Sequence, residues 1–180
     1  MKTQIRFAII NNNQLTQKII SYFTQFDFKL IEHKDGFIKL AHSSTLLDAW
    51  KSNPLKWGSE VSVSIFDSVV SADFYIDTDA QMNTKEEKAV WQTFIEDFQN
   101  YLTNGIAHYS KINSAITDNR KSRLGYLSWA VLGTLFGGLL SLFYSRLMGG
   151  NSTLGLFLIP VLASIFLAWK IRYTKTNKAL

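Results

Sequence analysis

Hydrophobic and polar positions in the first hundred residues change their period several times, and each change indicates a new element. Residues 4–10 alternate, with Ile5, Phe7 and Ile9 on one side, which predicts a strand. Residues 14–26 carry apolar side chains three and four positions apart, which predicts an amphipathic helix. Two short apolar runs at 28–34 and 37–42 surround Asp35-Gly36, a pair typical of a hairpin turn because it tolerates positive φ.

Two further alternating runs, 60–66 and 70–78, follow a connection at 43–59 and predict a second antiparallel pair. Thr84 and Glu87 match a capping box, which predicts the start of a helix over 85–103 that Gly105 ends. The expected order is β-α-β-β-β-β-α. The fold class is therefore α+β, with two helices covering one face of an antiparallel sheet and the other face exposed to solvent.

The last third of the chain has a different pattern, because it contains two long apolar segments. The first, 126–147, carries no charge before Arg146, and 154–169 carries none. About 20 apolar residues cross a bilayer as a helix. The sequence therefore predicts a two-helix transmembrane hairpin with spans at about 126–147 and 154–173. The expected domains are a cytoplasmic α+β domain at 1–105, an amphipathic connector at 106–125, and the hairpin with a basic tail at 126–180.

The positive charge of the chain, +5 in total, flanks these spans. An excess of Lys and Arg marks the cytoplasmic side of a membrane protein. The sequence therefore predicts an integral, two-pass protein of the inner (plasma) membrane with both termini in the cytoplasm. The basic side chains expected to contact lipid headgroups are Arg120, Lys121, Arg123, Lys170 and Arg172.

Other classes of protein lack their signals in this sequence. The absence of cysteine excludes disulfides, zinc-thiolate sites and thiol nucleophiles. The apolar run near the N-terminus has four residues, which is too short for a signal peptide. No basic groove interleaved with aromatic residues is present, so a nucleic acid is not an expected partner.

Four segments of the soluble part carry a resemblance to a known family. They are Phe28-Lys-Leu-Ile31, Asp35-Gly-Phe-Ile38, Trp57-Gly-Ser-Glu-Val61 and the helix from Trp91 to Leu102. Together they resemble small bacterial βαββββα modules, the helix-grip-like (BamC-like) domains, over about residues 3–103. The resemblance implies this fold and a binding or scaffolding role. The chain departs from the lipoprotein pattern because it has no cysteine for lipidation.

No catalytic motif stands out, so we expect no enzyme, no catalytic residue, no cofactor and no bound metal. One alternative rests on Asp73, Asp77 and Asp79, which share the strand parity of Tyr75. Carboxylate oxygens of this kind bind hard cations, as in a metal-dependent hydrolase. The other interpretation is that these aspartates lie on the solvent-exposed face of an outer strand.

Aromatic and glycine residues supply the remaining candidates. Trp50, Trp57 and Tyr75 are candidate contacts for a protein partner or a small apolar ligand, although the loop holding both tryptophans is more typical of a lid over the core. In the first span, small residues allow close helix packing, which serves either the second span or a second copy of the chain. These helix-packing candidates are Gly133, Gly137 and Gly138.

The leading functional hypothesis is a non-enzymatic, membrane-anchored binding or scaffold protein whose cytoplasmic domain performs the recognition. Its expected partners are the lipid bilayer and a protein or small apolar ligand. The alternative is an oligomeric membrane effector or channel, in which the cytoplasmic domain senses a signal and the hairpins of several copies form a pore.

Overall fold

The computed structural model describes residues 1–9, 14–43, 51–78, 84–147 and 160–166 of the chain. The chain divides into two compact units, Met1–Arg120 and Lys121–Leu180. One long helix, α3 (Tyr109–Leu147), contributes residues to both units.

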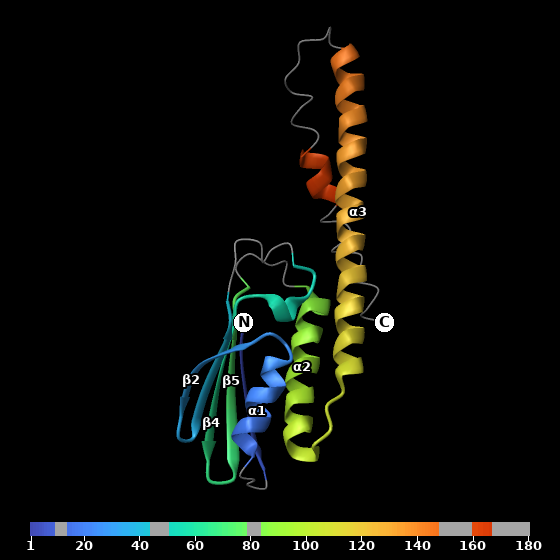
Figure 1. The fold of residues 1–180 in the computed structure, drawn as a ribbon. Helices are drawn as coiled ribbons and strands as arrows, with labels where there is room; N and C mark the ends of the chain where they lie inside the picture. The colour runs from blue at the N-terminus through green and yellow to red at the C-terminus, as the bar shows by residue number, and fades with distance from the viewer. Residues whose placement is uncertain (10–13, 44–50, 79–83, 148–159, 167–180) are drawn as a thin grey trace. The chain divides into compact units, whose positions relative to one another are not determined.

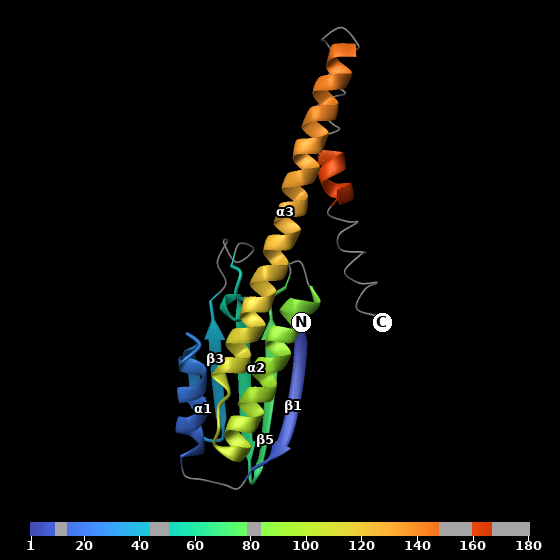
Figure 2. The ribbon, with the colours of Figure 1, turned by 90° about the vertical axis from the view of Figure 1, so that its right-hand side faces the viewer.

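The first unit is a five-stranded antiparallel sheet with α1 and α2 on one face (Figure 1). The second view has both helices in front of the sheet (Figure 2). The strand order across the sheet is β1-β5-β4-β3-β2. In chain order, the elements are β1 (Lys2–Ala8), α1 (Leu15–Thr24), β2 (Lys29–Lys34), β3 (Phe37–His42), the 3₁₀ turn η2 (Pro54–Lys56), β4 (Ser59–Phe66), β5 (Val69–Ile76), α2 (Lys85–Asn104) and α3. The α+β class and the β-α-β-β-β-β-α order of the first seven helices and strands are confirmed.

Local sequence signals explain two of the element boundaries. Gly36 lies in the hairpin turn between β2 and β3 with a φ of +69°, and a Cβ there would lie 2.9 Å from the carbonyl oxygen of Ile65. At the start of α2, the Glu87 N–H donates to the Thr84 Oγ1 at 3.2 Å, and the Thr84 N–H donates to the Glu87 Oε2 at 2.9 Å. Both the predicted hairpin and the predicted capping box are present.

The core lies between the sheet and the two helices and is rich in aromatic rings. Phe23 of α1 packs against Phe98 of α2 with ring centroids 4.9 Å apart, and against Phe74 of β5 at 6.2 Å. Val61 and Val63 of β4 are buried on the same face of the sheet. Alternation along β4 and β5 therefore directs one set of side chains into this core and the other set to the open face.

One buried acid joins the helices of the first unit. Asp97 of α2 accepts a hydrogen bond from the Tyr22 hydroxyl of α1 at 3.0 Å. Its other oxygen accepts from the backbone N–H of His108 at 2.6 Å, just before α3 begins. The His108 Nδ1 lies 3.5 Å from the same oxygen. Asp97 thus links α1, α2 and the loop that leads into α3.

The predicted connector is helical from Tyr109 onward, and its beginning belongs to the first unit. Ile112 is fully buried in the core, and Tyr109 and Ile116 pack against that core. The Asn119 Nδ2 donates to the backbone carbonyl of Ser52 at 2.9 Å. The apolar side of the first turns of α3 therefore faces the domain itself.

The second unit contains the rest of α3 and a helical stretch at 160–166. Among the described residues, α3 is the one helix whose length and composition suffice to cross a membrane. A Cβ on Gly133 would lie 2.8 Å from the Cα of Ala163, so this part of α3 packs closely on the 160–166 stretch. The second predicted span, 154–173, is described only at 160–166, so the two-helix transmembrane hairpin stays a prediction.

Tyr22 provides a test of the buried network through pH. Burial, followed by the charge of Asp97, raises the pKa of the Tyr22 hydroxyl far above its ordinary value of 10.0. The folded state therefore keeps a proton that the unfolded chain loses, so the stabilisation is complete below pH 10.0 and falls as pH rises further. In chemical denaturation of the full chain in mild detergent, the free energy of unfolding of the wild type should fall faster above this pH than that of Tyr22→Phe, by up to about 1.4 kcal/mol per pH unit. Equal slopes for the two proteins would contradict this account.

Candidate functional site

The open face of the sheet presents polar side chains from three adjacent strands at matching positions. Tyr75 of β5 is paired with Lys2 of β1 on one side and with Glu60 of β4 on the other. Two residues along the same strands, Asp73 is paired with Gln4 and with Ser62. Residues two apart on a strand point to the same face. The six side chains therefore form two neighbouring rows on one surface, which we call the sheet-face site: Lys2, Gln4, Glu60, Ser62, Asp73 and Tyr75.

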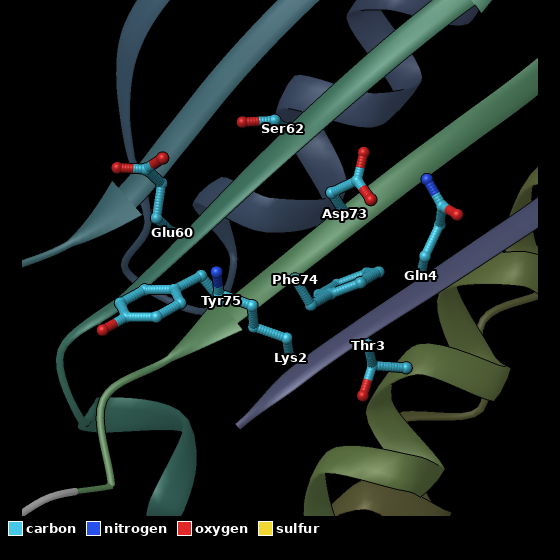
Figure 3. A pocket seen from close by; sticks show the side chains of 8 residues that line it. All are labelled: Lys2, Thr3, Gln4, Glu60, Ser62, Asp73, Phe74 and Tyr75. Atoms are coloured by element: carbon cyan, nitrogen blue, oxygen red, sulfur yellow. The ribbon is translucent and has the colours of Figure 1, made fainter.

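The sheet-face site surrounds a shallow hollow of about 460 Å³. Figure 3 shows its side chains on the three strands, with Thr3 and Phe74 also lining the hollow. The ring of Tyr75 is half exposed, at 51%, whereas the neighbouring Phe74 is buried in the core. Tyr75 is therefore the large aromatic surface that this site offers to a partner.

Charges of both signs meet at the sheet-face site. The Lys2 Nζ lies 5.7 Å from the centroid of the Tyr75 ring, a cation–π distance. The Lys39 Nζ of β3 lies 2.9 Å from the Glu60 Oε1. Exposed ion pairs of this kind contribute little to stability. Asp73 is exposed beside them. The arrangement can make hydrogen bonds and charge contacts with a polar partner surface.

The described part of the chain does not support the alternative of a metal centre. There, no three His, Cys, Asp or Glu side chains lie close enough together to hold a metal ion. Asp73 and Asp77 belong to that part, and Asp79 lies outside the described residues.

Trp57 takes a place in the core instead of the contact role predicted for it. Its side chain is 1% exposed, and its Nε1–H donates to the backbone carbonyl of Lys51 at 3.3 Å. Leu55 of η2 is buried beside it in the same cluster. The burial of Trp57 agrees with the lid interpretation of the loop. A buried indole offers no surface to a partner. Trp50 lies outside the described residues.

The helix-packing glycines of α3 differ in their surroundings. Gly133 and Gly137 are buried, and they are four residues apart on one face of the helix. A Cβ on Gly138 would meet nothing within 4 Å. The contact of Gly133 with Ala163 lies within one chain. Gly133 therefore has the intramolecular role that was one of its two predicted uses.

The structure describes three of the five basic residues that were predicted to contact lipid headgroups. Arg120 and Lys121 are exposed on α3, and Arg123 is half-buried. Lys170 and Arg172 lie outside the described residues. The role of these side chains at lipid headgroups stays a prediction.

Sequence reasoning found Tyr75, and it found Asp73 as a candidate cation ligand, but it missed the other members of the sheet-face site. Lys2 and Gln4 belong to β1, which is more than 60 residues from its partner β5, so their proximity depends on the sheet order. Alternation along β1 was a usable signal, because it places Lys2, Gln4 and Arg6 on the side opposite to Ile5 and Phe7.

No family model, curated protein or solved structure matches this chain. The resemblance to helix-grip-like domains therefore stays a prediction.

Trp57 and Tyr75 should respond differently to truncation. Trp57→Ala removes a buried indole and should lower the free energy of unfolding by about 3–5 kcal/mol because it leaves a cavity. Tyr75→Ala removes an exposed ring and should lower it by less than about 1 kcal/mol. Denaturation of the full chain in mild detergent measures both. A loss of the same size for the two variants would contradict the assignment of Trp57 to the core and Tyr75 to the surface.

Proposed function

We propose that this protein is a non-enzymatic, membrane-anchored binding or scaffold protein, whose sheet-face site recognises a protein partner. In this proposal it is a two-pass protein of the inner (plasma) membrane with both termini in the cytoplasm. The observation that carries the proposal is the contrast between two surfaces of one chain. The first unit carries the polar sheet-face site, and the second exposes a long apolar helix.

The exposed apolar side chains of α3 support membrane anchoring. Leu127, Leu135, Leu139 and Leu142 are each more than half exposed. Soluble proteins rarely expose contiguous apolar surface of this extent. In a bilayer, lipid acyl chains would cover these side chains and keep them out of contact with water. The exposed Arg120 and Lys121 precede the apolar stretch, where anionic headgroups would attract them.

The composition of the sheet-face site supports recognition of a protein. Its hollow is shallow and lined by charged, amide and hydroxyl groups around one half-exposed tyrosine. Tyrosine is enriched in protein interfaces because it combines a large ring with a hydrogen-bonding hydroxyl. Enclosed apolar pockets suit small ligands better, so a partner with its own polar surface fits this site.

The alternative of an oligomeric effector or channel receives less support. A pore needs association between several copies, and small residues are the usual contact surface of such helices. Gly133 already packs on Ala163 of the same chain. This favours passive anchoring over assembly through that face.

A photo-crosslinking experiment tests recognition at the sheet-face site. A benzoyl-phenylalanine at Tyr75 should crosslink the full chain to a discrete protein in native membranes, since Tyr75 would lie in the interface. The same probe at Lys88, which is exposed on α2, is the matched control and should give no such product.

The crosslinking experiment with the two probe positions also has a clear negative outcome. The proposal fails if the Tyr75 probe gives no protein adduct, or if both positions capture the same set of proteins in equal amounts. Tyr75→Ala should leave the free energy of unfolding nearly unchanged, so loss of a partner in that variant would not come from unfolding.

A further inference from the structure

A second hollow, of about 290 Å³, lies on a different part of the first unit. Its walls come from the residues that follow α1, from η2 and the residue before it, and from the first turns of α3. These three segments are far apart in the sequence. The hollow is close to the lower size limit of known small-molecule pockets, so it fits a ligand of one or two rings.

Aromatic and aliphatic side chains form part of the lining of this hollow. The rings of Phe26 and Tyr109 lie with their centroids 5.8 Å apart at 48°. Leu55 is buried, and Ile116 is half-buried on α3. A flat apolar ring could pack against these side chains.

Carboxamide groups and the Tyr109 hydroxyl supply the uncharged polar part of the lining. The Asn53 Oδ1 accepts a hydrogen bond from the Leu55 N–H at 3.1 Å, so its amide N–H groups remain as donors. Gln25 is hydrogen-bonded to the Tyr109 hydroxyl, whose pKa is raised mainly by burial, so this hydroxyl stays neutral. Asn113 is exposed on α3 at the rim. Groups of this kind donate and accept without carrying charge.

The charges at the rim cancel each other. The Lys56 Nζ lies 3.6 Å from the Asp27 Oδ2, and both residues line the hollow. Because the two opposite charges offset each other, the rim offers no net attraction to a ligand of either sign.

We infer that this hollow binds a small uncharged aromatic molecule that carries a carboxamide-like hydrogen-bonding edge. The aromatic wall packs against its ring, and the amides of Asn53 and Asn113 bond to its edge. This site is separate from the sheet-face site and adds a ligand to the proposed function. Because the lining includes both η2 and α3, the bound molecule would also strengthen the packing of the first turns of α3 on the domain.

Three molecules of equal size test the inference directly. Benzamide is neutral, benzoate is an anion and benzamidine is a cation. Each is titrated into the full chain in mild detergent, with empty micelles as the blank, and binding is followed by saturation-transfer NMR. Benzamide should bind, and each charged analogue should bind at least tenfold more weakly. Failure of benzamide to bind up to its solubility, or equal affinity for all three, would overturn the inference.

A matched pair of substitutions locates the site. Asn113→Trp should fill the hollow and weaken benzamide binding at least tenfold, because Asn113 is exposed at its rim. Ser114→Trp, on the next residue of α3 and outside the lining, should leave the affinity unchanged. Circular dichroism of both variants should match the wild type. Unchanged affinity in a folded Asn113→Trp variant would place binding elsewhere and overturn the inference.

Discussion

The buried carboxyl group of Asp97 is the constraint on which the first unit depends. A buried acid is costly unless hydrogen bonds satisfy it. Here its donors come from two other parts of the chain, the Tyr22 hydroxyl and the His108 backbone N–H. Satisfying this one group therefore brings α1 onto α2 and holds the loop before α3 against both. The aromatic core then fills the space between these helices and the sheet.

The start of α3 follows from the same constraint. With His108 held at Asp97, the next turns of α3 bring Ile112 into the core. The hollow lined by Tyr109 and η2 exists because α3 begins at this place. The network thus connects the packing of the domain to the helix that we propose as its membrane anchor.

Much of the first unit could be predicted because its signals are local. Asp35-Gly36 fits its turn through backbone conformation, and Thr84 with Glu87 satisfies free N–H groups within one helical turn. Alternation along 60–66 also predicted the strand β4. The candidate site was harder, because it depends on contacts between distant segments. Tyr75 was found from its type and parity, whereas its neighbours Lys2 and Gln4 required the β1–β5 pairing. Trp57 carries the same aromatic signal as Tyr75, and only the packing of its loop shows that it is buried.

The central claim is that the apolar part of α3 anchors the protein in a bilayer. Alkaline carbonate extraction of native membranes tests it most directly, since this treatment releases peripheral proteins and leaves spanning ones in the pellet. The full chain should stay in the pellet, and a chain ending at Arg120, the last residue of the first unit, should appear in the supernatant. Release of the full chain by carbonate would contradict the account.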